Sequence, residues 1–105
     1  MKYSLIYFTA PSKKQAHLIC KKLLSLRLIA CANVLGKADS LYRWKGKIEK
    51  SSEWSVLLKT RKLYFQKICK VIRNHHAYTV PAILEIPVNN GDKPFLDWIQ
   101  NETRP

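Results

Sequence analysis

The chain contains little glycine, little cysteine and few acidic residues. Its 105 residues include three glycines, three cysteines and 7 Asp and Glu, against 19 Lys and Arg. Three scattered glycines exclude a glycine-rich loop that cradles phosphates, because such a loop needs several glycines close together. An odd number of widely spaced cysteines without a C-x-x-C pair disfavours a disulfide framework or a zinc knuckle. We therefore expect Cys20, Cys31 and Cys69 to be ordinary core residues.

A long hydrophobic run is also absent. No segment approaches the roughly 18 apolar residues that a membrane-spanning helix needs, and the short apolar run of residues 3–8 lacks the features of a signal peptide. We therefore expect a cytoplasmic protein that makes no contact with a membrane. Hydrophobic residues make up 47% of the chain and charged residues 25%, which is typical of a soluble globular protein. This length predicts a single domain, spanning residues 1–105.

The scarcity of acidic residues leaves a formal net charge of +12. All but two of the Lys and Arg precede residue 74, whereas the last third of the chain is slightly acidic. Such a balance favours affinity for polyanions, and it makes the surface a poor place to concentrate free metal cations.

Segments rich in β-branched and aromatic residues predict the strands. The first spans residues 3–9. The second spans residues 28–35 and is stopped by Gly36, although its pattern resumes at Ser40. Lys45-Gly46 then predicts a two-residue hairpin turn, because glycine accepts the positive φ that such turns require. The returning strand continues to Thr60.

Apolar residues at helical spacing predict the helices. Ser12 and Gln15 form the pattern of a capping box at the start of the first helix, and Thr60 is a candidate cap for the second. A last strand at residues 78–88 contains two prolines, which favour an edge position. Asp92 is a candidate cap for a short terminal helix. Its predicted inward-facing residues are Phe95, Trp98 and Ile99.

The order of elements predicts an α+β fold. It is β-α-β-β-α-β with a short C-terminal helix, the ferredoxin-like pattern, in which both long helices cover one face of a four-stranded antiparallel sheet. The strands are apolar on both sides, yet no helix remains that is large enough to cover the second face. Because large exposed apolar surfaces are uncommon in monomers, we expect a homo-oligomer.

Six segments, in this order and spacing, resemble the CutA family of divalent-cation tolerance proteins. The resemblance extends from about Thr9 to Ile99. The segments are Thr9-Ala10-Pro11, Ala30-Cys31-Ala32-Asn33, Ser40 to Glu49, Glu53 to Thr60, His76-Ala77-Tyr78-Thr79-Val80-Pro81 and Leu96-Asp97-Trp98-Ile99.

The resemblance implies a trimer of ferredoxin-like subunits, similar to the PII signalling proteins, with long hairpins pairing across subunits. The family is cytoplasmic in bacteria, is linked to tolerance of copper and other divalent metals, and has no associated catalytic constellation. The sequence likewise lacks a Ser/His/Asp set and paired carboxylates. We therefore expect a protein that is not an enzyme and requires no cofactor, with copper or another divalent cation as a candidate ligand.

His75 and His76 are the candidate metal ligands. Imidazoles are common copper ligands, and some copper-binding family members pair a His-His step with a Cys just before Thr-Ala-Pro. That position is Phe8 here, so the thiolate that favours soft copper is absent. Adjacent side chains also diverge, and two imidazoles make an incomplete site. The alternative is a helix-terminal His beside a packing His.

A second candidate site follows from family positions that, by analogy with PII-type trimers, lie near the clefts between subunits. Aromatic residues with one Lys and one Glu are suited to a small anionic effector, the aromatics stacking and the Lys pairing with its charge. The alternative is that the aromatics brace the interface between subunits. The residues are Tyr42, Trp44, Glu53, Lys59, Tyr78 and Trp98.

RNA binding is a third, less favoured hypothesis. RNA-recognition domains share this order of elements and stack bases on sheet aromatics, a role open here to Tyr3 and Tyr7. The third strand, however, lacks the RNA-recognition signature, and a trimer would bury the sheet face that RNA needs. We therefore do not expect nucleic acid as a partner.

Overall fold

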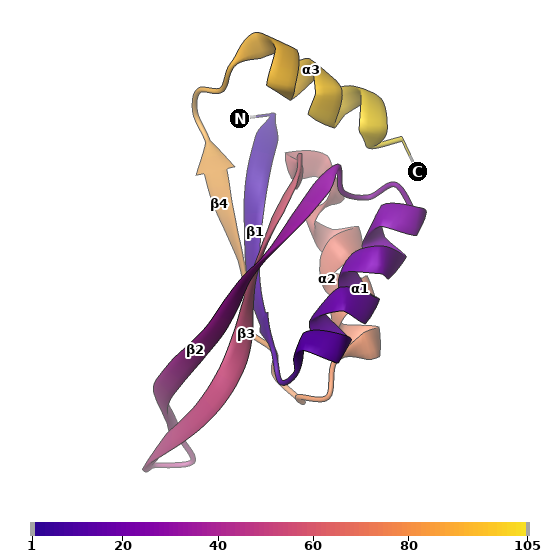
Figure 1. The fold of residues 1–105 in the computed structure, drawn as a ribbon. Helices are drawn as coiled ribbons and strands as arrows, with labels where there is room; N and C mark the ends of the chain where they lie inside the picture. The colour runs from indigo at the N-terminus through magenta and orange to yellow at the C-terminus, as the bar shows by residue number, and fades with distance from the viewer. Residues whose placement is uncertain (1, 105) are drawn as a thin grey trace.

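The computed structural model describes residues 2–104. Its elements follow the predicted order, with one short 3-10 helix added before the second long helix (Figure 1). They are β1 (Tyr3–Ala10), α1 (Lys13–Ser25), β2 (Cys31–Trp44), β3 (Lys47–Arg61), η1 (Lys62–Tyr64), α2 (Phe65–His75), β4 (Ile83–Val88) and α3 (Lys93–Glu102).

The four strands form one antiparallel sheet in the order β2-β3-β1-β4. Helices α1 and α2 lie side by side on one face of this sheet, and α3 lies across one end of it (Figure 1). This arrangement confirms the predicted α+β, ferredoxin-like fold. Among residues 2–104, no helix is long and apolar enough to cross a membrane.

The core lies between the sheet and the two long helices. Along β1, Ile6 and Phe8 are fully buried beneath the helices, while Leu5 and Tyr7 point to the opposite face and are partly exposed. Ile19 of α1 and Ile68 of α2 are also fully buried. Each such side chain contributes about 1.5–3 kcal/mol when removed from water.

Helix α1 begins where the sequence predicts, but its capping box is only half formed. The Gln15 amide donates to the Ser12 hydroxyl oxygen at 3.1 Å, which is the expected N-cap bond. The Gln15 side chain does not accept the second hydrogen bond of a capping box, which would come from the Ser12 amide. Its Oε1 instead accepts a hydrogen bond from the Ala77 amide at 3.3 Å and so links α1 to the segment after α2.

Strand β2 differs from the prediction at both ends. It begins at Cys31 instead of Leu28, and it continues through Gly36 to the hairpin turn. The register with β3 shifts between Val34 and Gly36, and Gly36 has a φ of 130°. Glycine therefore allows a bulge in a continuing strand here, where the prediction took it as a stop.

The hairpin turn has the predicted position and geometry. Lys45 and Gly46 have φ values of 51° and 79°, as the favoured two-residue turns require, and Trp44 pairs with Lys47 across the turn. The hairpin of β2 and β3 extends well beyond the helices (Figure 1), so the molecule measures 45 × 26 × 23 Å.

Two boundaries near the second helix were predicted wrongly. Thr60 caps no helix, because it lies in β3 and its buried hydroxyl donates to the Leu28 carbonyl at 2.5 Å. Strand β4 begins at Ile83 instead of Tyr78, so the preceding segment is irregular. Strand β4 lies at the edge of the sheet and contains Pro87, one of the two prolines, which has no N–H to donate to a ladder.

The terminal helix α3 packs less deeply than its spacing predicts. Only Ile99 is buried, whereas Phe95 and Trp98 remain 43% and 40% exposed. Asp92 occupies the N-cap position without making a side-chain capping bond.

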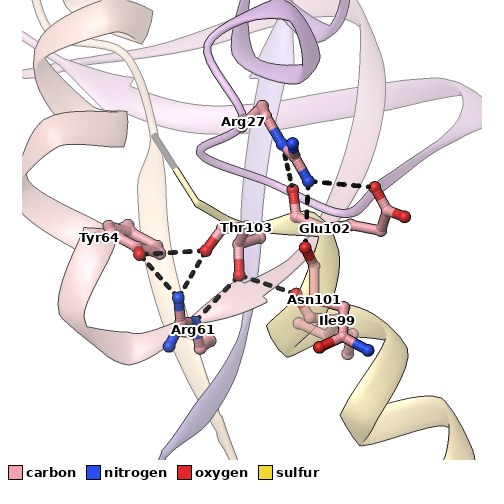
Figure 2. Close-up of polar contacts among 7 residues, drawn as sticks. All are labelled: Arg27, Arg61, Tyr64, Ile99, Asn101, Glu102 and Thr103. Carbon is pink, nitrogen blue, oxygen red and sulfur yellow. Dashed lines mark hydrogen bonds and ion pairs between the residues drawn. The ribbon is translucent and has the colours of Figure 1, made fainter.

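Two arginines hold the C-terminal end of α3 (Figure 2). The Arg61 guanidinium donates to the Thr103 hydroxyl and carbonyl oxygens and to the Tyr64 hydroxyl. Arg27 donates to the backbone carbonyls of Asn101 and Glu102. These donors satisfy carbonyls that have no partner within the helix, so α3 is fixed to the sheet through β3 and the end of α1.

Candidate functional site

The two predicted metal ligands lie at the end of α2 and have different surroundings. His75 is exposed, and its Nδ1 donates to the Val71 carbonyl at 2.9 Å. This contact leaves Nε2 facing outward, with no hydrogen bond to residues 2–104. A histidine that binds metal usually has this arrangement, with its other ring nitrogen donating to a carbonyl or carboxylate.

Both ring nitrogens of His76 are engaged by the backbone. Nδ1 accepts a hydrogen bond from the Tyr78 amide at 3.0 Å, so this nitrogen carries no proton. Nε2 lies 2.6 Å from the Thr9 carbonyl oxygen and must donate to it, because a carbonyl only accepts. His76 therefore has no free lone pair while these two bonds are intact.

No wider ligand cluster surrounds the histidines. Within residues 2–104, no three His, Cys, Asp or Glu side chains gather in a way that could hold a metal ion. Phe8, which stands where the family resemblance suggested a cysteine ligand, is fully buried in the core. Of the four ring nitrogens of His75 and His76, only Nε2 of His75 makes no hydrogen bond to residues 2–104 and is free to ligate a metal.

The second candidate site is a pocket of about 780 Å³ between the hairpin and the segment after α2. It brings together strands β1, β2 and β3 with an irregular stretch that the chain reaches only after its second long helix. The lining residues are Tyr7, Thr9, Asp39, Ser40, Leu41, Tyr42, Trp44, Glu53, Ala77, Tyr78, Thr79, Val80 and Ala82.

Four of the six predicted cleft residues line this pocket, and two lie elsewhere. Tyr42, Trp44, Glu53 and Tyr78 belong to the lining. The Lys59 ammonium lies 5.4 Å from the centre of the Phe95 ring, on the underside of α3. Trp98 is also on α3, with its ring 5.5 Å from that of Phe95.

The floor of the pocket is polar and contains a buried carboxylate. Glu53 is only 8% exposed, and its Oε2 accepts a hydrogen bond from the Thr9 hydroxyl at 3.1 Å. Burial raises the pKa of the Tyr78 hydroxyl, and the negative charge of Glu53 and a hydrogen bond to it raise this pKa further. The Tyr7 hydroxyl lies 3.1 Å from the Ser55 hydroxyl.

Several lining residues were not predicted. Tyr7 and Asp39 line the pocket from β1 and β2, and Ala77, Thr79, Val80 and Ala82 line it from the segment after α2. Tyr7 lies on the sheet face opposite the helices, but no local signal in the sequence shows that this part of the face borders a pocket. Tyr3, the other candidate for stacking RNA bases, donates its hydroxyl to Gln100 of α3 at 3.0 Å.

Comparison with known proteins identifies the family. The family model described as CutA1 divalent ion tolerance protein matches residues 4–102. The divalent-cation tolerance protein CutA of Archaeoglobus fulgidus is 41% identical over 97 residues, which cover 92% of this chain and 94% of that protein. The protein of the same name from Thermus thermophilus is 35% identical over 99 residues, covering 94% and 96%.

Solved structures agree with this result. The structure of the periplasmic divalent cation tolerance protein CutA from Archaeoglobus fulgidus has a TM-score of 0.95 at 39% identity, covering 97% of this chain and 99% of that one. The divalent ion tolerance protein CutA1 from Ehrlichia chaffeensis has a TM-score of 0.92 at 35% identity, covering 100% and 99%. The resemblance found in the sequence is thus confirmed, and the chain belongs to the CutA1 divalent ion tolerance family.

Proposed function

We propose that this protein serves in the tolerance of divalent cations, copper among them, without catalysing a reaction. The observation that carries this proposal is the family match over residues 4–102, with relatives of similar length that are named divalent-cation tolerance proteins. The test is deletion of the gene in its own host. Growth of the deletion strain should fall at copper concentrations that the parent tolerates, and plasmid-borne protein should restore it.

Direct metal binding in this proposal is weak and centres on His75, next to His76. The outward Nε2 of His75 supplies one good ligand, while both nitrogens of His76 are engaged. A single imidazole leaves most of a copper coordination shell to water or to a second copy of the chain. The net charge of +12 opposes the approach of free cations as well.

Calorimetric titration with copper measures this binding. We expect weak binding that His75→Ala removes and that His76→Ala leaves within about twofold, because His76 has no free nitrogen. Binding that survives both substitutions would place the copper elsewhere on the chain.

The assembly that we propose is a homotrimer in the cytoplasm. Within residues 2–104, no second layer covers the sheet face opposite α1 and α2, and Leu84 and Ile86 on its edge strand are 62% and 43% exposed. Copies of the same chain are the natural cover for such a surface. Sedimentation should therefore give three times the mass of the chain. Cell fractionation decides the compartment, since the relative from Archaeoglobus is described as periplasmic.

A second candidate function is the binding of a small effector molecule in the pocket. The volume of about 780 Å³ and the aromatic lining are in the range of small-molecule sites. The Lys59 side chain, on which the expectation of an anionic effector rested, lies outside the pocket lining. Binding can be followed by the fluorescence of Trp44, which lines the pocket, with Trp44→Leu as the reference.

A further inference from the structure

The pocket between the hairpin and residues 77–82 has the opposite charge to the rest of the protein. The chain as a whole has a net charge of +12. In contrast, the only charged residues that line the pocket within residues 2–104 are Asp39 and Glu53, and both are acidic. The strand register places the Glu53 side chain on the hairpin face that carries Tyr42 and Trp44, whereas the Asp39 side chain belongs to the other face. The charged side chain on the pocket face is therefore negative and favours a cation there, although the net charge of the protein opposes one.

The Glu53 carboxylate has no positively charged partner within residues 2–104. Among the described residues, no lysine, arginine or histidine forms an ion pair with it, and its neighbours are the Thr9 and Tyr78 hydroxyls. A carboxylate that is 8% exposed is costly without a counter-charge, because hydroxyl groups replace its hydration only in part. The chain has 19 Lys and Arg, so the lack of an ion pair at Glu53 within the described residues sets this site apart from the rest of the protein.

Four aromatic residues line the pocket together with Glu53. Tyr7, Tyr42, Trp44 and Tyr78 all line the pocket. The face of an aromatic ring is electrostatically negative and attracts ammonium and guanidinium groups that approach within about 6 Å of its centre. Such faces offer nothing to an anion, and they are poor ligands for hard metal cations, which bind several oxygen atoms at once.

We propose that this pocket binds a cationic nitrogen group, an alkylammonium or a guanidinium, with Glu53 as its counterion and the aromatic side chains as its walls. This inference rests on the second candidate function, ligand binding in the pocket, and specifies the chemical class of the ligand. Two sources could supply the group. One is a free organic cation, and the other is a basic side chain from the hairpin tip of a second copy, where Arg43, Lys45 and Lys47 are exposed.

The experiment titrates the protein with tetramethylammonium chloride, with tert-butyl alcohol as a neutral probe of similar size and with citrate as an anion. Trp44 fluorescence and calorimetry are the readouts. We expect saturable binding of tetramethylammonium, with a change in Trp44 fluorescence, and no saturation with the other two probes. Glu53→Gln should weaken this binding by about tenfold or more, since it removes the charge at nearly constant size.

Two further variants control for folding. Glu49→Gln removes an exposed carboxylate from the same strand, outside the pocket lining, and should leave the binding unchanged. Trp44→Leu removes one aromatic wall at a position that is 46% exposed, so the fold should tolerate it. We expect Trp44→Leu to weaken tetramethylammonium binding by several-fold, measured by calorimetry.

The assembly distinguishes the two sources of the cation. If a second copy fills the pocket, free tetramethylammonium does not bind to the wild-type assembly. In that case Glu53→Gln and the triple variant Arg43→Gln/Lys45→Gln/Lys47→Gln each weaken the assembly in sedimentation. Together they weaken it no more than either does alone. This result supports the inference with the hairpin as the source.

Two results would overturn the inference. If citrate binds and tetramethylammonium does not, the pocket is a ligand site for anions, and only the proposed charge of the ligand is wrong. If no probe binds, and neither Glu53→Gln nor the triple variant changes the assembly, then the inference and the second candidate function both fail.

Discussion

The imidazole of His76 donates to the backbone carbonyl of Thr9 at 2.6 Å, across 67 positions of the chain. The same ring accepts from the Tyr78 amide, so one side chain connects the end of β1 to the start of the segment that forms a wall of the pocket. This role is structural, and it competes with metal binding because a metal would need one of the two engaged nitrogens.

Loss of this connection should destabilise the protein. We expect His76→Ala to lower the free energy of unfolding by about 1–3 kcal/mol, because two hydrogen bonds disappear and their backbone partners are left to find others. His75→Ala is the matched control. Its ring is exposed and bonds only within its own helix, so its cost should stay below about 0.5 kcal/mol. Urea denaturation measures both, and equal losses would contradict the assigned role of His76.

The buried thiol of Cys20 should make stability depend on alkaline pH. Burial raises the pKa of this thiol from 9.0 to about 11, so the folded state holds the proton in a range where the unfolded state has released it. Stability from this group is complete below pH 9.0 and is lost as the pH rises towards about 11. We therefore expect the urea midpoint of the wild type to fall more steeply over this range than that of Cys20→Ala, measured with reductant present. Parallel curves would contradict this expectation.

The hydrogen bonds of Arg61 at the C-terminal end of α3 should require a guanidinium group, which has several N–H donors in one plane. Arg61 bonds Thr103 twice and Tyr64 once, and a lysine ammonium cannot reproduce that geometry. We expect Arg61→Lys to cost about 1–3 kcal/mol and to speed amide hydrogen exchange throughout α3.

Arg27→Lys provides the comparison for Arg61. Arg27 bonds the same helix end, but its ion pair with Glu102 is about half exposed. Exposed contacts of this kind contribute at most about 1 kcal/mol. If Arg27→Lys lowers the free energy of unfolding more than Arg61→Lys does, then Arg27 contributes more than Arg61 to holding the C-terminal end of α3.

The hairpin turn contains a residue that can be improved. Lys45 has a φ of 51°, a conformation that asparagine tolerates better than lysine. We expect Lys45→Asn to raise the free energy of unfolding by up to about 1 kcal/mol, seen as a higher melting temperature. Lys47→Asn, two residues along and within β3, should give no gain, because asparagine is disfavoured in strands.

Much of the fold could be predicted because its signals are local. The first strand and the cap at Ser12 depend on a few neighbouring residues, and both are found where the sequence predicts them. The errors at Gly36 and Thr60 have a common cause. Each residue type permits more than one local role, and its pairing with a distant segment decided which one it adopts.

The candidate site could be predicted only in part. Glu53 and Lys59 lie on the same strand, six residues apart, so their side chains are separated by about 20 Å along an extended backbone. They could not meet in one small pocket, and the structure places Lys59 beneath α3 instead. The pocket lining therefore lacks the lysine of the predicted site and keeps Glu53.

The sequence by itself determined the order of elements, the turn at Lys45-Gly46 and the family, because these depend on backbone geometry and spacing along the chain. Only the tertiary structure decided that both nitrogens of His76 are engaged and that the pocket is acidic in a basic protein. Those properties arise where β1, the hairpin and residues 77–82 meet. The charge of a recess is the sum of the side chains that line it, and those side chains come from segments that are far apart in the sequence.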